Sequence, residues 1–144
     1  MFAPSAADVR RFFCRAWAKQ QAGQPLEPIE ALAAGWIAEH PEYHAELADE
    51  TRAIARAYPD RDGQTNPFLH LAMHLSISEQ CSIDQPRGIR RAIEQLTSRQ
   101  GGLHQAHHEA MSCLGQMLAD AQTNGHPFDG NAYLQAVQRR ATRD

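Results

Sequence analysis

Apolar side chains recur every three or four positions along most of this chain, which is the spacing of an α-helix with one buried face. The first of these stripes contains Val9, Phe12, Phe13, Ala16 and Trp17. Proline and glycine residues interrupt the pattern between stripes, and no stretch alternates apolar and polar residues as a half-buried strand would. The sequence therefore predicts an all-α fold, a compact bundle of six or seven helices.

Capping residues and prolines mark where the predicted helices begin, because they satisfy or avoid the unpaired N–H groups of a first turn. These markers stand at Ser5, Pro28, Pro41, Asn66 and Asp129. The third helix is predicted over the segment PEYHAELADETRAIARAY, and the sixth runs from about Leu103 to Thr123. The turn-rich segment YPDRDGQT predicts a connector before the helix that begins at Asn66.

The segment NPFLHLAMHLSISEQ, residues 66–80, is apolar on nearly every side of a helix. A helix of this kind has no face to give to solvent, so we expect it to run through the core. His70 and His74 interrupt its apolar residues four positions apart, and they therefore lie on one face. Because an unpaired buried polar group is costly, these imidazoles are expected to have partners elsewhere in the chain.

A second pair of histidines lies in the long predicted helix, within the segment HQAHHEAMSCLGQML. His104 and His108 are four positions apart and share one face. At about 100° per residue, His107 lies at the edge of that face. The same stripe continues through Met111, Gly115 and Leu118. The pattern predicts that the second pair also faces the interior of the bundle.

Two helices that each present an i, i+4 pair of histidines inward can together hold a metal ion. The predicted ligands are His70, His74, His104 and His108. Imidazole suits zinc, iron, copper and nickel, so the donor atoms alone do not select a divalent ion. We expect zinc or iron before copper, because the neighbouring Met73 and Met111 are typical gap-filling core residues. An open coordination position would activate water for hydrolysis or, with iron or copper, support oxygen chemistry.

Two further side chains are possible ligands of the same ion. Glu79 follows His74 by five positions, a spacing that resembles the histidine-then-acid spacing of hemerythrin-like bundles, where the two side chains can serve different irons. A carboxylate would also offset the charge that four neutral imidazoles leave uncompensated. His44 is included as an extra ligand, four positions after His40. His40 itself is left out, because Pro41 makes it a capping residue and not a mid-helix one.

The same histidines are compatible with a purely structural role. A buried imidazole is ordinarily hydrogen-bonded to a carbonyl or a side chain, and two facing pairs can form a polar network inside the core. The protein would then be a non-enzymatic interaction module whose partner is another protein. The sequence supports both hypotheses and indicates no reaction, so we leave open whether the protein is an enzyme.

The composition narrows the choice of partners and compartment. The chain has 144 residues, which predicts a single domain over 1–144. Its net charge of −3 at pH 7 gives no general attraction to nucleic acid or to anionic membranes. The three cysteines show no CxxC spacing, and the first residues lack the layout of a signal peptide. We expect a cytoplasmic protein that binds neither nucleic acid nor a membrane, and we leave its homo-oligomeric state open.

Several segments together resemble one protein family. They are HPEYH, NPFLHLAMHLSISEQ with SIDQPRGIR, the HxxxH of the long helix, MSCLGQML and YLQAVQRR, and they extend over almost the whole chain. On these segments the sequence is similar to the bacterial family known as domain of unknown function 1841. The resemblance implies a bacterial cytoplasmic protein and brings no activity with it.

Overall fold

The computed structural model describes residues 5–57 and 66–142, and within these ranges the secondary structure consists of helices alone. Eight α-helices and one short 3-10 helix, η1, occur in these ranges, which confirms the predicted all-α class. None of the described helices is both long and apolar enough to cross a membrane. The connector predicted from YPDRDGQT falls on residues 58–65 and lies outside the described residues.

The chain forms two compact units, residues 1–75 and 76–144, and the boundary falls inside the helix α5 (Pro67–Ile83). The first unit contains α1 to α4 and the first half of α5. The second unit contains the second half of α5 and the helices α6 to α8. Whether the two units make one domain, as the chain length predicts, stays a prediction.

The first two helices begin where the sequence provides their N-terminal signals. Ser5 and Asp8 form a capping box at the start of α1 (Ala6–Gln21), since each side chain accepts a hydrogen bond from the other residue's N–H at 3.1 and 3.2 Å. Pro28 opens α2 (Pro28–Ala38), where its missing N–H would have no helical partner. Both starts were predicted from the sequence, and the structure confirms them.

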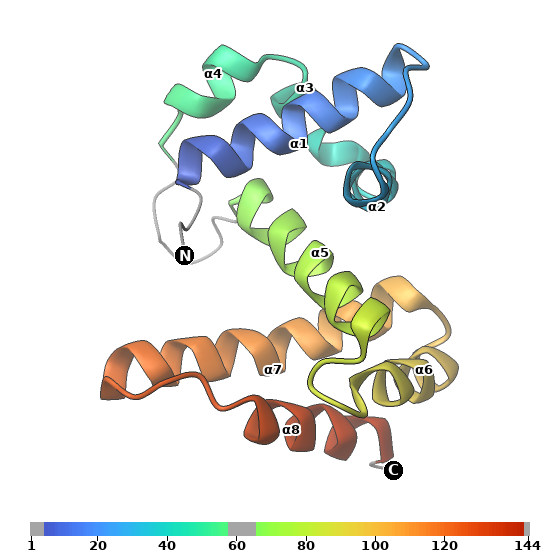
Figure 1. Ribbon diagram of the computed structural model, residues 1–144, viewed down its shortest axis with the longest axis vertical. Helices are drawn as coiled ribbons and strands as arrows, with labels where there is room; N and C mark the ends of the chain where they lie inside the picture. The colour runs from blue at the N-terminus through green and yellow to red at the C-terminus, as the bar shows by residue number, and fades with distance from the viewer. Residues whose placement is uncertain (1–4, 58–65, 143–144) are drawn as a thin grey trace. The chain divides into compact units, whose positions relative to one another are not determined.

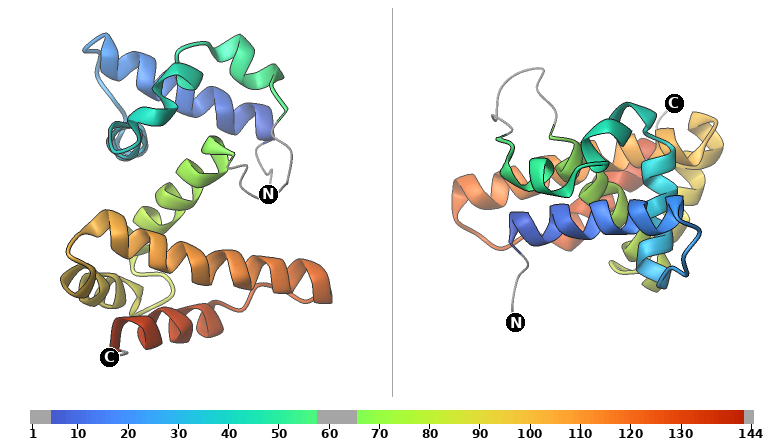
Figure 2. Two further views of the ribbon diagram at one scale, coloured as in Figure 1. Left: turned by 180° about the vertical axis from the view of Figure 1, so that it is seen from behind. Right: turned by 90° about the horizontal axis from the view of Figure 1, so that it is seen from above.

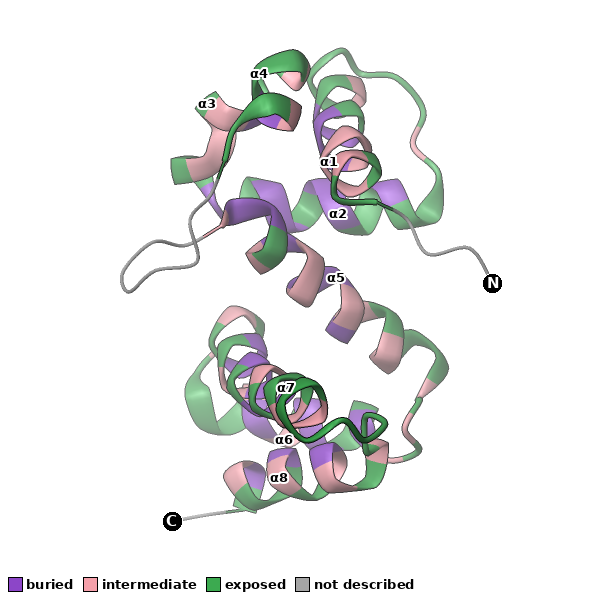
Figure 3. Ribbon diagram, turned by 90° about the vertical axis from the view of Figure 1, so that its left-hand side faces the viewer, coloured by how far each residue is buried: buried purple, intermediate pink, exposed green. Residues whose placement is uncertain are grey.

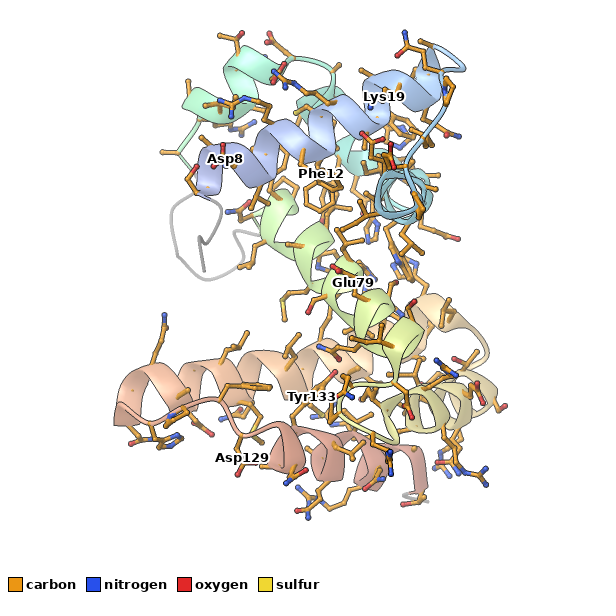
Figure 4. All side chains as sticks on the ribbon, viewed as in Figure 1. Asp8, Phe12, Lys19, Glu79, Asp129 and Tyr133 are labelled. Atoms are coloured by element: carbon orange, nitrogen blue, oxygen red, sulfur yellow. The ribbon has the colours of Figure 1, made fainter. Side chains whose placement is uncertain are left out.

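The core of the first unit lies where α1 packs across α2, with the start of α5 beside them (Figure 2). Large aromatic and aliphatic side chains fill it, among them Phe13, Trp17, Trp36, Ile37, Phe68 and Leu71. Each such side chain contributes roughly 1.5–3 kcal/mol when it is fully buried. At the rim, Lys19 of α1 pairs with Glu30 of α2 at 2.8 Å, and Figure 4 labels this lysine.

The third predicted helix is divided into three short ones, which corrects the expectation of a single helix over PEYHAELADETRAIARAY. The three are η1 (Pro41–Tyr43), α3 (His44–Leu47) and α4 (Glu50–Ala55). The break lies at Asp49, whose backbone is extended and whose carboxylate accepts a hydrogen bond from the Arg52 N–H at 3.1 Å. Aspartate favours such caps over helix interiors, because its side chain competes for backbone N–H groups.

The helix α5 begins as predicted but is less uniformly buried than its apolar sequence suggests. The Asn66 side chain caps it by accepting hydrogen bonds from two N–H groups of the first turn, at 3.0 and 3.3 Å. Leu71 is fully buried, whereas Leu69 and Ile83 are 60% and 68% exposed. The expectation of core on nearly every side, made for residues 66–80, is therefore wrong at Leu69, and Figure 3 shows exposed and buried residues along the same helix.

The second unit is built from α6 (Ile89–Gln100), α7 (Leu103–Asn124) and α8 (Gly130–Thr142), which pack against one another (Figure 1). Gly101 closes α6 with a φ of +81°, in the left-handed region that favours glycine. Asp129 caps α8 as predicted, since its carboxylate accepts a hydrogen bond from the Ala132 N–H at 3.0 Å.

A partly buried hydrogen bond links the second half of α5 to α8 of the second unit. The Tyr133 hydroxyl of α8 donates to Oε1 of Gln80 on α5 at 2.7 Å, and Figure 4 labels the tyrosine. The Tyr133 ring is fully buried, and burial raises the pKa of its hydroxyl far above the usual range. Tyr133 therefore remains a neutral donor at any physiological pH.

Candidate functional site: two histidine groups

His40 follows the end of α2 and occupies the N-cap position of η1, as its place before Pro41 predicts. Its ring is nevertheless buried, with 2% of its surface exposed. Nδ1 of His40 lies 2.7 Å from the Trp36 carbonyl oxygen. Because a carbonyl only accepts, Nδ1 is the donor, and the lone pair of the neutral ring is on Nε2. Histidines that bind metals are commonly fixed in this way, by a hydrogen bond from the other ring nitrogen to a carbonyl.

Two histidines of α5 lie against His40, and we call His40, His70 and His74 the first histidine group. The three ring centres form a nearly equilateral triangle, with sides of 4.9 Å (His40–His70), 4.8 Å (His40–His74) and 4.9 Å (His70–His74). His74 is completely buried and His70 is half-buried. Three imidazoles from two segments of the chain therefore meet inside the first unit.

The dimensions of this group suit a metal ion. One ring nitrogen of His40 and one of His74 lie within 4.8 Å of each other. Two nitrogens bound to one tetrahedral ion are about 3.3 Å apart, and their ring centres roughly 5 Å apart, because a zinc–nitrogen bond is about 2.0–2.1 Å long. The ring centres of the first histidine group already have this spacing.

Aromatic side chains stack on two of the three imidazoles. The Trp36 ring is nearly parallel to His74, with ring centres 4.0 Å apart and an angle of 16° between the planes. The Tyr43 ring is parallel to His40, at 5.2 Å and 1°. Burial raises the pKa of the Tyr43 hydroxyl. These contacts hold the imidazole planes in place and exclude water from their faces, as a preformed ligand site requires.

His44, included as an extra ligand from the sequence, is engaged elsewhere in the first unit. Its Nε2 donates to the Ile37 carbonyl oxygen at 2.8 Å. Its ring packs against Trp17, with ring centres 4.4 Å apart. His44 thus links α3 to the end of α2. The imidazole that lies beside His70 and His74 is that of His40, which was not among the ligands expected from the sequence.

The second histidine group consists of His104, His107 and His108 on α7. The rings of His104 and His108 lie 4.5 Å apart, and these two residues offer ring nitrogens within 4.8 Å of each other. His104 is half-buried and His108 is exposed, whereas His107 is only 2% exposed. The predicted pair thus comes together, but the buried member of this group is the histidine placed at the edge of the stripe.

The buried face of α7 differs from the predicted one. It consists of Ala106, His107, Ala110, Met111, Cys113 and Leu114. Leu118, predicted to face inward, is 46% exposed. The helix packs against both α6 and α8, and the small side chains on its buried face permit close helix packing. The expectation that the stripe of His104 and His108 forms the interior face is corrected accordingly.

His107 is held in its neutral form by its surroundings. Burial lowers its pKa from 6.5 to about 4, and the nearby His104 and His108 add to the effect because like charges repel. A neutral imidazole keeps one nitrogen as a donor and one as an acceptor. His107 is therefore a neutral, buried polar group at physiological pH.

Glu79, the acidic ligand predicted from the sequence, lies on the exposed side of α5. Figure 4 labels it on that helix. Its place agrees with its spacing of five positions from His74, which corresponds to about 140° around an ideal helix. The buried imidazoles of the first histidine group are therefore not matched by a buried carboxylate at this position.

The predicted four-histidine site draws on both units of the chain. His70 and His74 belong to the first unit, and His104 and His108 belong to the second. That the two pairs hold a single ion therefore stays a prediction. Within the first unit alone, the structure brings together three imidazoles, of which His40 and His74 are buried.

Sequence reasoning missed His40 and His107 for different reasons. His40 forms an i, i+4 pair with His44, and the sequence favours His44 because Pro41 makes His40 a capping residue and not a mid-helix one. The backbone before a proline is extended, but its side chain is free to turn into the core. For His107, the signal was the stripe of small residues Ala106, Ala110 and Cys113, which marks a close helix contact.

The fold and the two histidine groups define the class of protein, an all-helical protein whose buried imidazoles can hold a metal ion or form a polar network. The chain belongs to the family described as Domain of unknown function (DUF1841), whose family model matches residues 5–139. This confirms the resemblance seen in the sequence. No curated protein and no solved structure matches the chain.

Proposed function

We propose that this protein binds a divalent transition-metal ion, with His40 and His74 as buried ligands and His70 as the third imidazole beside them. The observation that carries the proposal is the triangle of ring centres with sides of 4.8–4.9 Å. It is supported by the Nδ1 hydrogen bond of His40, which fixes the orientation of this ring. The aromatic rings stacked on His40 and His74 add the rigid surroundings that such a site needs.

Zinc and iron rank above copper as the bound ion. A donor set of neutral imidazoles suits all three, and nickel as well. A copper site is commonly completed by a soft sulfur ligand. Met73 is only half-buried on α5 and Met111 belongs to the buried face of α7, where a methionine is typical of core packing. Nothing in these positions favours copper over zinc or iron.

The test is the metal content of the protein purified without a histidine tag, measured by elemental mass spectrometry. We expect zinc or iron close to one equivalent per chain. Because metal bound to the native state alone stabilises it, removal from protein held at 100 times Kd costs about 2.7 kcal/mol. A chelator at pH 7.5 then lowers the melting temperature by roughly 10 °C. Since protons compete with the metal for the imidazole nitrogens, the chelator effect disappears well below about pH 6.

Stoichiometry decides between one ion and two. If His104 and His108 bind the same ion as the first histidine group, the wild type binds one equivalent of metal. His74→Ala and His108→Ala then each abolish binding. If the second group binds separately, His108→Ala leaves one equivalent bound. A wild-type protein that holds no metal after reconstitution, and whose melting curve a chelator does not change at pH 7.5, contradicts the proposal.

A second function is favoured by two hydrogen bonds in the first unit. His40 and His44 both donate to carbonyl oxygens of α2, those of Trp36 and Ile37, as structural histidines do. The protein would then be an interaction module for another protein, with imidazoles that only order its core. In that case His74→Ala destabilises the fold while chelators have no effect at any pH.

We place this function in the cytoplasm, without nucleic acid or membrane as a partner. This placement is supported by the net charge of −3, which gives the protein no general attraction to nucleic acid or to anionic lipids. Three free thiols, Cys14, Cys81 and Cys113, are also in keeping with a reducing compartment. Burial raises the pKa of the Cys14 and Cys81 thiols to about 11, so both are poor nucleophiles at neutral pH.

A further inference from the structure

A cavity of about 360 Å³ lies between α7 and α8 in the second unit. Its wall combines polar side chains with an apolar floor. The lining residues are Ser112, Cys113, Gln116 and Met117 of α7, and Ala136, Arg139 and Arg140 of α8. None of them belongs to either histidine group, so the cavity is independent of the proposed metal site.

The two arginines of this cavity differ in how their charges are compensated. Arg140 is paired with Glu109 at 2.6 Å and also donates to the Ser112 hydroxyl at 3.3 Å. The hydrogen bond to Glu109 raises the pKa of Arg140. Arg139 makes no ion pair or hydrogen bond with any residue that the structure describes. Among the described residues, the cavity therefore contains one guanidinium with no opposite charge paired to it, beside a guanidinium that is already fixed.

The position of Arg139 in the last turn of α8 agrees with the negative end of the helix dipole. The helix dipole explains why a basic residue occurs at position 139, but it does not explain the cavity beside it. The floor contains Cys113, which is 4% exposed, together with Met117 and Ala136. Ser112 and Gln116 add a hydroxyl and an amide that can donate hydrogen bonds to a ligand at the rim.

We propose that this cavity binds a small monocarboxylic acid, with Arg139 holding the carboxylate and the apolar floor receiving a short aliphatic chain. A guanidinium binds a carboxylate through two parallel hydrogen bonds. A single uncompensated charge matches a monoanion, whereas a phosphate dianion calls for a second one. Met117 is an adaptable contact for an aliphatic chain of variable shape.

The experiment is a titration of the full-length protein with butyrate at pH 7, followed by amide nitrogen–proton NMR in the presence of a chelator. We expect saturable shifts at Gln116, Met117 and Arg139, with a Kd on the order of 1–10 mM. Acetate binds roughly tenfold more weakly, because it lacks two methylene groups that the floor would bury. Inorganic phosphate binds more weakly than butyrate.

Two variants sharpen the result. Arg139→Gln, at an exposed position, weakens butyrate binding at least tenfold, and Arg99→Gln, which removes an exposed arginine in the last turn of α6, leaves it unchanged. Arg139→Lys keeps the charge without the planar fork and gives an intermediate Kd. The proposal is overturned if butyrate causes no saturable shifts around the cavity, if Arg139→Gln binds as the wild type does, or if phosphate binds more tightly than butyrate.

Discussion

The two histidine groups of this protein are built in opposite ways. In the first, His40 comes from the end of α2 and meets His70 and His74 of α5, about 30 positions further along the chain. In the second, all three imidazoles come from neighbouring positions of α7. Spacing in the sequence alone is enough to bring the second group together, whereas the first depends on the packing of α5 on α2.

The difference shows what an i, i+4 rule can and cannot predict. The rule correctly places His104 beside His108, with ring centres 4.5 Å apart. It does not predict which face of α7 is buried, and His107 takes the interior position instead. In the first group the rule pairs His70 with His74, but the aromatic rings that stack on the imidazoles, Trp36 and Tyr43, come from α2 and η1.

The largest expected effect separates the two groups by burial. His74→Ala removes a completely buried ring that stacks on Trp36, so we expect the metal-free protein to lose about 2–4 kcal/mol of unfolding free energy. His108→Ala removes an exposed ring from a helix, and we expect a change within about 0.5 kcal/mol. Urea denaturation of both variants in the presence of a chelator measures the difference.

The chelator matters because bound metal would add its own stabilisation to the wild type alone. Equal losses in the two variants would mean that burial in the second group is as complete as in the first. A loss confined to His108→Ala would reverse the comparison.

The second expected effect concerns His107 and acid. Its pKa in the folded protein is about 4, against 6.5 when unperturbed, so the unfolded chain binds more protons between these values. The contribution of His107 to the unfolding free energy is therefore complete above about pH 6.5. It falls as the pH drops and is lost below about pH 4. A pKa difference of this size corresponds to about 3 kcal/mol. Urea denaturation from pH 4 to pH 7.5 measures it.

His107→Gln isolates this contribution, because glutamine keeps a donor and an acceptor but does not titrate. The difference in stability between wild type and variant should change by about 3 kcal/mol across this range. His126→Gln, at an exposed position, is the matched control. Carboxyl groups whose pKa values are lowered, such as Glu30 and Asp84, also lose their contribution to stability on acidification. They do so equally in the wild type and in both variants, so their effect cancels in the difference.

Much of the fold could be predicted because its signals are local. The capping box of Ser5 and Asp8, the Asn66 cap of α5 and the Asp129 cap of α8 each depend on residues within one turn. The division of the third helix was missed because Asp49 is tolerated inside a helix by propensity alone, at a modest cost. Whether Asp49 caps a new helix or continues the old one depends on how α3 and α4 pack on α1. No local sequence pattern encodes that packing.

The histidine sites were less predictable because burial is a tertiary property. The sequence identifies which histidines share a helix face, but His40 enters the first group only when α2 and α5 come together. Likewise, His44 was expected as a ligand, yet the Ile37 carbonyl and the Trp17 ring engage it. Both outcomes depend on partners that lie outside any one helix.

A smaller effect distinguishes His40 from His44 as a metal ligand. We expect His40→Gln to weaken zinc binding 10- to 100-fold, or about 1.4–2.8 kcal/mol, since it removes a ligand whose Nδ1 hydrogen bond orients it. His44→Gln should change the affinity less than about threefold, because it acts on zinc only through packing. Competition titrations with a zinc-binding dye measure both. A larger loss in His44→Gln would return His44 to the ligand set in place of His40.

The smallest expected effect is that of Glu79→Gln. Glu79 is exposed on α5, so its carboxylate is hydrated, and replacing it should change the unfolding free energy by less than about 0.5 kcal/mol. If the first histidine group binds its ion through imidazoles alone, zinc affinity is also unchanged, as in the control Glu94→Gln at an exposed position of α6. A neutral ligand set leaves the ion's charge uncompensated, which is the reason a carboxylate was expected from the sequence. A tenfold loss of affinity in Glu79→Gln, with full stability and an unaffected Glu94→Gln, would therefore show that the ion recruits this carboxylate and that the hemerythrin-like spacing has functional meaning.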